Sequence, residues 1–246
     1  MNYQELHSWD MTAEEAQAQQ TAMRGLVSLE DGFGEIKTLA GVDLSFDIEG
    51  NRGHAVVVVL SCPDFRVLET RYATAALKMP YIPGLLSFRE SPVALEAFAQ
   101  LETVPDLLMI DGQGQAHPRG FGIACHLGVL LDVPSIGVAK SFLYGHYDAA
   151  ALGEAAGDSV PLTDRAGRRV LGSVTRTKPR TNPLFLSPGH KVSVESATRL
   201  VLDCVRGYRL PEPTRQAHNL ITAYKKAGAD GLVAAAPAPT QETLSL

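Results

Sequence analysis

The chain has 246 residues, of which 45% are hydrophobic and 20% charged, a composition that excludes a disordered or fibrous protein. The formal net charge is −5, no apolar run is long enough to span a bilayer, and the polar N-terminus carries no signal-peptide pattern. The three cysteines are widely spaced without a CxxC, which argues against a disulfide framework or a thiolate zinc site. We therefore expect a cytoplasmic protein with no membrane association.

The charge is unevenly distributed along the chain. Residues 165–226 contain 13 Lys and Arg against 3 Asp and Glu, whereas the rest of the chain contains 9 and 24. Such a basic segment favours contact with nucleic acid or phosphate. The alternative is that these charges, although close in sequence, do not gather on one surface.

The first third of the chain predicts one helix and three strands. A helix is expected over residues 12–29, where Thr12 and Glu15 fit a capping box. Alternating and β-branched residues bounded by turn sequences then predict strands at residues 39–46, 54–61 and 67–75. Because the connections between these strands are short, they predict an antiparallel meander.

Helices and strands alternate in the middle of the chain. Ser91 and Pro92 are typical of the N-cap and first residue of a helix that reaches about residue 101. The elements expected next are a buried strand at 106–110, a helix at 120–131 and a buried strand at 135–138. The pattern predicts an α/β fold with a mixed β-sheet, three antiparallel strands followed by parallel strands, flanked by helices.

The last hundred residues carry weaker signals. Residues 148–168 are polar and Gly-rich and are expected to be loops, with edge strands at 169–175 and 184–186. Helices with basic outer faces are expected at 194–206 and 214–226. We predict one domain over residues 1–230 and a disordered tail over 231–246.

Three carboxylates stand at positions where chemistry is plausible. Asp43 lies inside an apolar strand, where a charge must be paired or bind a metal, unless it faces the solvated side. Asp111 ends the run LLMI, and ligands of open α/β sheets bind beyond strand ends, although Asp before Gly also starts ordinary turns. Glu90 precedes the predicted helix and could equally be a solvated first-turn acid.

The three acids together indicate more than each does alone. In the ribonuclease-H-like topology the first and fourth strands are neighbours, so acids on the first strand, at the next helix and after the fourth strand converge. Such carboxylates hold divalent cations for phosphodiester hydrolysis. Oxygen ligands select Mg²⁺ or Mn²⁺ rather than zinc. The sequence therefore predicts a ribonuclease-H-like fold with a magnesium site at Asp43, Glu90 and Asp111.

Four motifs resemble the endonuclease V family, the deoxyinosine-specific repair nucleases. They are GVDLSF at 41–46, PYIPGLLSFRE at 80–90, DGQGQAHPRGFGIACHLG at 111–128 and IGVAKS at 136–141. The resemblance runs in order from about residue 8 to residue 227. It implies a metal-dependent enzyme that cuts the second phosphodiester 3′ to deaminated adenine and leaves 3′-hydroxyl and 5′-phosphate ends.

The resemblance also implies roles for individual residues. Asp43, Glu90 and Asp111 match the metal-binding acids, and Lys140 and His218 match further catalytic positions. Tyr81 matches the residue that is inserted where the lesion leaves the stack. The other positions assigned to DNA or lesion contact are Pro80, Ile82, Gly112, His117, Gly122 and Ile123.

Each of these roles agrees with elementary chemistry, but the same residues could also have ordinary structural roles. An aromatic ring between two prolines can replace a stacked base, but it can also pack an ordinary surface loop. Lys140 after a buried strand could stabilise phosphate charge, and His218 on a basic helix could deprotonate water, although either could be a routine surface residue. Gly112 and Gly122 let backbone approach a ligand closely, and the backbone could read the edge of hypoxanthine.

Three functions stay open at this point. The first is a Mg²⁺-dependent nuclease, with Mn²⁺ as a substitute, acting as a monomer on deoxyinosine DNA and on other deaminated or mismatched bases. The second keeps the fold but cleaves inosine-containing RNA, which a contact to the 2′-hydroxyl would decide. The third is a non-catalytic binder of inosine strands, which three clustered acids argue against because a binder does not need repelling charges.

Overall fold

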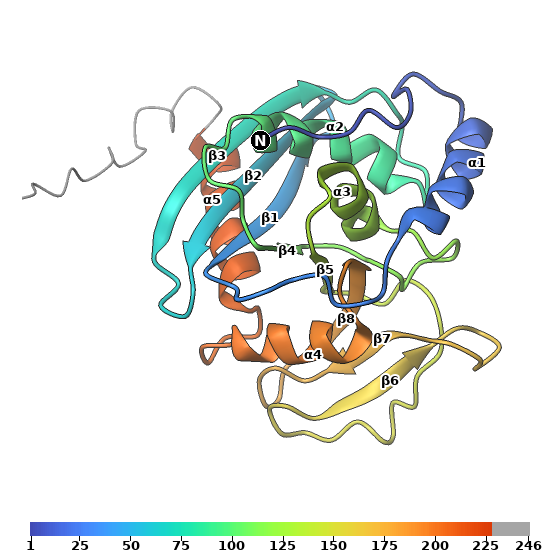
Figure 1. Ribbon diagram of the computed structural model, residues 1–246, viewed down its shortest axis with the longest axis vertical. Coiled ribbons are helices and arrows are strands. Elements are labelled where there is room, and N and C mark those ends of the chain that lie inside the picture. The colour runs from blue at the N-terminus through green and yellow to red at the C-terminus, as the bar shows by residue number, and fades with distance from the viewer. Residues whose placement is uncertain (228–246) are drawn as a thin grey trace, which may run out of the picture.

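The computed structural model describes residues 1–227 and contains eight strands. They are β1 (Thr38–Asp47), β2 (Arg52–Ser61), β3 (Val67–Ala76), β4 (Leu107–Ile110), β5 (Ser135–Ala139), β6 (Ser159–Thr163), β7 (Val170–Thr175) and β8 (Leu184–His190). All eight form one mixed sheet in the order β3-β2-β1-β4-β5-β8-β7-β6. Figure 1 shows β3 (cyan) at one end of this sheet and β6 (yellow) at the other.

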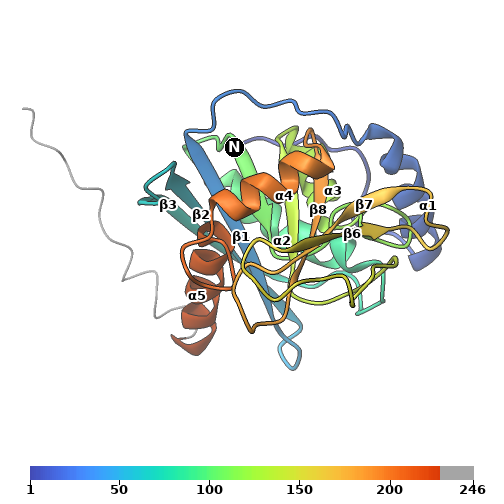
Figure 2. The ribbon, with the colours of Figure 1, turned by 90° about the horizontal axis from the view of Figure 1, so that it is seen from below.

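Helices cover both faces of the sheet, as the sequence predicts. They are α1 (Ala13–Met23), α2 (Leu86–Ala99), α3 (Ile123–Leu131), α4 (Val194–Asp203) and α5 (Glu212–Ala227). α2 and α3 share one apolar core with β1 and β2, while α4 and α5 pack on the opposite face. Figure 2 shows α5 lying along β1 and β2. None of the helices in residues 1–227 combines the length and apolarity needed to cross a bilayer.

The run of four valines in β2 is explained by burial on both faces. Val57 and Val59 pack in the core under α2, whereas Val56 and Val58 pack against Ile221 of α5. Side chains alternate between the faces of a strand, so a continuous apolar run is required where both faces are covered. α5 is thereby fixed against the sheet by its own apolar side chains.

The position of β1 brings two acids together. β1 is antiparallel to β2 and parallel to β4, and the Asp111 N–H donates to the Val42 carbonyl at 2.9 Å. Asp43, the residue after Val42, therefore lies beside Asp111, the first residue after β4. The prediction that the first and fourth strands are neighbours is confirmed.

The start of α2 differs from the prediction. The helix begins at Leu86, so Pro92 is inside it and Glu90 lies on the helix rather than before it. No side chain caps this start; instead Leu85 and Phe88 are buried against α1 and the preceding loop. Tertiary packing stabilises the first turns and outweighs the local signal from Pro92.

The last strands also differ from the prediction. The expected loop 148–168 contains β6, whose five residues include Pro161; β6 is the sheet edge, where proline is tolerated. The strands at 169–175 and 184–186 are not edges, because β8 pairs with β5 and β7 lies between β8 and β6. Pro188 and Gly189 are unfavourable in strands, so the sequence alone predicts a shorter strand than β8.

The remaining helix boundaries are close to the predictions. The capping box of Thr12 and Glu15 is present, but α1 ends at Met23 and a 3₁₀ turn follows. α3 starts only at Ile123, because Gly122 is its extended N-cap. The predicted disordered tail at 231–246 lies outside the described residues.

Candidate active site

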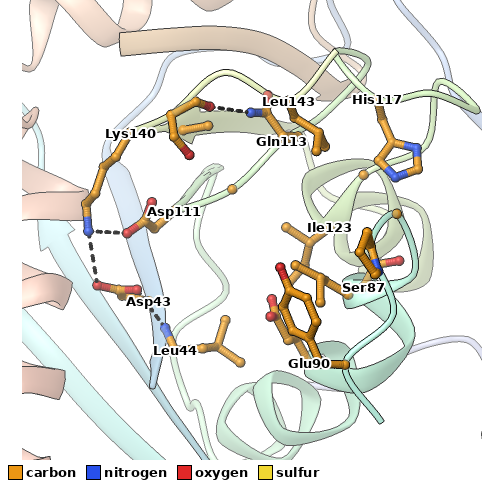
Figure 3. Close-up of a pocket in the computed structure, with 18 of the residues that line it drawn as sticks. Asp43, Leu44, Ser87, Glu90, Asp111, Gln113, His117, Ile123, Lys140 and Leu143 are labelled. Atoms are coloured by element: carbon orange, nitrogen blue, oxygen red, sulfur yellow. Dashed lines mark hydrogen bonds and ion pairs between the residues drawn. The ribbon is translucent and has the colours of Figure 1, made fainter. Parts of the chain in front are cut away.

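Two carboxylates, one ammonium and one imidazole meet beyond the C-terminal ends of β4 and β5. Lys140 pairs with Asp111, and its Nζ lies 3.8 Å from Asp43 Oδ2 (Figure 3). His218 Nδ1 lies 2.9 Å from the same Asp43 oxygen. Four of the predicted catalytic residues therefore form one cluster, with Asp43 only 5% exposed.

The backbone around the cluster holds each group in place. Asp43 Oδ1 accepts a hydrogen bond from the Leu44 N–H at 2.8 Å. The Lys140 carbonyl accepts one from Arg209 Nη2 at 2.8 Å. Gly41 lets α5 approach β1, since a Cβ there would lie 1.9 Å from the Pro213 carbonyl oxygen. This close approach places His218 over Asp43.

Burial raises the pKa of two acids of the site, Asp43 and Glu90. Burial, and then the charge of Asp111, raise the pKa of Asp43 to about 6, against the opposing effects of Lys140 and His218. Burial also raises the pKa of Glu90 to about 8; the nearby Arg89 opposes this, while Asp111 and Asp43 add to it. A cation entering the pocket would favour the ionised form of both carboxyls.

The cluster fits a divalent cation by the chemistry of its donors. Ligand atoms of Asp43, Asp111 and His218 all lie within 4.8 Å of one another. The Lys140 ammonium contacts both carboxylates, so the protein places one of its own positive charges there. Glu90 is not in this group; in Figure 3 it lies across the pocket from Asp43 and Asp111.

Asp43, Asp111 and Lys140 of the cluster form one wall of a cavity of about 550 Å³. This volume is in the range of small-ligand sites. Besides the acids and Lys140, its lining includes Tyr81, Gly112, His117, Gly122 and Ile123. Two other predicted contact residues, Pro80 and Ile82, are not in the lining: Ile82 packs against a small core beneath the loop, and Pro80 is exposed.

The loop that lines this cavity, residues 112–122, is pinned to the sheet. The Gly114 N–H donates to Ser187 Oγ at 2.9 Å, and a Cβ at Gly114 would lie 2.2 Å from the Pro188 carbonyl oxygen. A Cβ at Gly122 would lie 2.2 Å from the Gln113 carbonyl oxygen. These two glycines are required for close contact between backbone segments, which makes the pocket rigid.

His117 offers the cavity a neutral imidazole. It is buried, and burial together with the Arg119 charge lowers its pKa to about 4. The Arg119 N–H donates to His117 Nδ1 at 3.2 Å, so the ring proton is on Nε2. His117 can therefore act as a hydrogen-bond donor without carrying charge.

Several positioning residues have no clear signal in the sequence. Arg119 Nη2 donates to the Gly84 carbonyl at 2.6 Å, and its Nε donates to Gln20 of α1. This clamp joins the loop that carries Tyr81 to the pocket loop. The Arg89 guanidinium lies 5.9 Å from the centre of the Tyr81 ring. Gln20 is buried and donates to the Phe121 carbonyl at 2.7 Å, a structural role that one sequence does not reveal.

Comparison with known proteins gives consistent matches. The family model for endonuclease V matches residues 21–219. The chain is 48% identical over 226 residues to endonuclease V from Gloeobacter violaceus, covering 90% of each chain.

Solved structures agree with this match. Endonuclease V from Streptomyces avermitilis superposes with a TM-score of 0.82 at 38% identity, covering 89% of this chain and 95% of that one. The Ciona intestinalis endonuclease V, solved in complex with a 24mer DNA containing an inosine followed by a ribo-adenosine, gives 0.76 at 26% identity, covering 87% and 97%.

Proposed function

The chain belongs to the endonuclease V family and is a nuclease, and we propose that it recognises deoxyinosine in DNA and hydrolyses the second phosphodiester 3′ to it. The products carry 3′-hydroxyl and 5′-phosphate ends. Deoxyinosine arises when adenine is deaminated, so the reaction opens a damaged strand for repair. Residues 1–227 act together as one nuclease domain in this proposal.

One observation carries the proposal: the buried carboxylates and the cavity that can hold a base are parts of the same pocket. A nucleotide held in the cavity brings its own strand to Asp43 and Asp111. The inosine-containing DNA bound by the Ciona intestinalis relative supports inosine as the base.

Asp43 and Asp111 are the proposed ligands of a Mg²⁺ ion, for which Mn²⁺ would substitute. Hard oxygen ligands favour these two ions. When bound, such an ion supplies Lewis-acid stabilisation of the phosphate and lowers the pKa of a water. Glu90 lines the same pocket from the opposite wall, and a cation bound there would favour its ionised form.

His218 is the proposed general base. Its Nδ1 contacts both Asp43 and Lys140 Nζ, at 2.9 and 3.1 Å. When Nδ1–H donates to Asp43, the ring is oriented and Nε2 is left free to accept a proton from water. Lys140 is half-buried at the rim, where its ammonium can contact an oxygen of the scissile phosphate.

Tyr81 is the proposed wedge. Its side chain is 65% exposed at the edge of the cavity, so the ring is available to stack on the base pair next to the displaced inosine. Displacement costs stacking energy, which an aromatic ring can replace. His117 Nε2–H and the rigid backbone of 112–122 then meet the base inside.

A cleavage assay on paired substrates tests the function. A labelled duplex with one inosine and the same duplex with adenine are incubated with Mg²⁺ or with EDTA. We expect strand cleavage only of the inosine duplex with Mg²⁺. Cleavage of both duplexes, or cleavage in EDTA, would contradict the proposal. A parallel inosine RNA tests the ribonuclease alternative, which faster cleavage of RNA than of DNA would favour.

A further inference from the structure

A second groove opens from the same carboxylates on the α5 side. It has a volume of about 300 Å³ and shares Asp43, Leu44, Asp111 and Lys140 with the cavity described above. We call it the α5 groove. Its other lining residues are Ser45, His218, Ile221, Thr222, Lys225 and Lys226.

The α5 groove becomes more basic with distance from the carboxylates. His218, Thr222 and Lys225 are four and three residues apart, which places them on one face of α5. Lys225 Nζ donates to the Phe46 carbonyl at 2.8 Å, so the ammonium lies at the end of β1. In the lining of this groove the only acids are Asp43 and Asp111.

Polar groups in the α5 groove are also suited to phosphate. Ser45 lies two residues after Asp43 on β1 and therefore on the same face of the sheet. Its Oγ lies buried at the groove and has no hydrogen-bond partner among residues 1–227. Thr222 adds an exposed hydroxyl. Two ammonium groups and two hydroxyls can bind phosphate oxygens, whereas the ammonium groups would repel a second metal ion.

We propose that the α5 groove binds the sugar-phosphate backbone on the 3′ side of the cleaved bond. This inference rests on the proposed function, in which the inosine lies 5′ to the cut. The base cavity then holds the 5′ part of the strand, and the carboxylates hold the scissile phosphate. The strand that leaves the carboxylates on the other side is therefore the 3′ part, and the α5 groove lies in its path.

The length of the groove sets how many nucleotides it contacts. From His218 to Lys225 the helix rises about 10 Å. This corresponds to about three nucleotides of a stacked strand at about 3.4 Å each. Lys225 and Lys226 would then neutralise phosphates two or three nucleotides beyond the cut.

Substrates of different 3′ length test the proposal. Single-stranded inosine DNAs are made that end one, three or eight nucleotides beyond the cleaved bond, and KM and kcat are measured for each. For the wild-type protein we expect KM to fall as the strand lengthens and to level off at about three nucleotides. In K225Q/K226Q the ratio of KM between the shortest and longest substrates should shrink about tenfold, about threefold for each lost phosphate contact.

Matched variants separate charge at the groove from general effects. K37Q/R66Q removes the same charge at the other end of the strands, where Lys37 precedes β1 and Arg66 precedes β3, and should keep the wild-type ratio. K225R/K226R should restore it. An unchanged ratio in K225Q/K226Q, or failure of the arginine variant to restore it, would overturn the inference. If the wild-type protein cleaves none of the three DNAs, the proposed function fails instead.

Discussion

Replacing Tyr81 with alanine should weaken recognition of inosine in duplex DNA with little effect on folding. The side chain is 65% exposed, so its removal exposes little apolar surface that the folded protein buries. Its contact with Arg89, 5.9 Å from the ring centre, is worth about 0.5–1 kcal/mol at an exposed site. Stacking of a base on an aromatic ring is worth about 1–3 kcal/mol. At about 1.4 kcal/mol per factor of ten, the variant should lose about tenfold to hundredfold in duplex affinity.

The assay compares binding and cleavage of inosine duplexes with inosine single strands. The loss in Tyr81→Ala should be smaller on single strands, where less stacking is broken, and Tyr81→Phe should be nearly silent because the ring carries the role. Tyr208→Ala is the control, since Tyr208 is 54% exposed and stacks under Arg215 at 4.5 Å. Equal losses on duplex and single strand would refute the wedge and would indicate that Tyr81 only packs its loop.

Three further predictions concern the metal, the pH and the charge. Asp43→Ala or Asp111→Ala should abolish Mg²⁺-dependent cleavage but retain binding of inosine DNA in a gel-shift assay, because loss of a carboxylate also removes repulsion of phosphate; full activity of either variant would contradict the metal assignment. Burial raises the pKa of Glu90 from 4.5 to about 8. Between these two pH values the folded protein binds more protons than the unfolded chain, so its stability falls as pH rises. Calorimetry should therefore show a larger Mg²⁺-dependent increase in Tm at pH about 8.5 than at about 6, and Glu90→Gln should flatten the metal-free profile; a metal effect that is independent of pH would argue against this. Neutralising several arginines of residues 165–226 should reduce the salt dependence of DNA binding, and an unchanged slope would show that this segment does not contact the backbone.

The central part of the fold could be predicted because its signals are local and strong. Alternation and β-branching define β1 to β3, and short turns leave an antiparallel meander as the simplest pairing. Neighbouring first and fourth strands then bring Asp43 and Asp111 together. The family resemblance is confirmed by the comparisons, although it, rather than the pattern alone, pointed to Lys140 and His218.

Other features depend on contacts between distant segments and leave no local signal. α2 starts early because Leu85 and Phe88 are buried against α1, which no capping pattern announces. β6 contains a proline that is tolerated only because the strand lies at the edge. In the sequence Gly122 suggested space for a ligand, whereas the structure shows it in close contact with the backbone of Gln113.

Mapping the cut at single-nucleotide resolution tests the central claim most directly. A duplex with one inosine, labelled at the 5′ end of the inosine strand, is cleaved with Mg²⁺ and run beside a sequence ladder, and the ends are checked with phosphatase and ligase. The account predicts one product that ends in a 3′-hydroxyl one nucleotide beyond the inosine, a 5′-phosphate on the other fragment, and no cleavage by Asp111→Ala. Cleavage at the inosine itself, cleavage on its 5′ side, or equal cleavage by Asp111→Ala would contradict it.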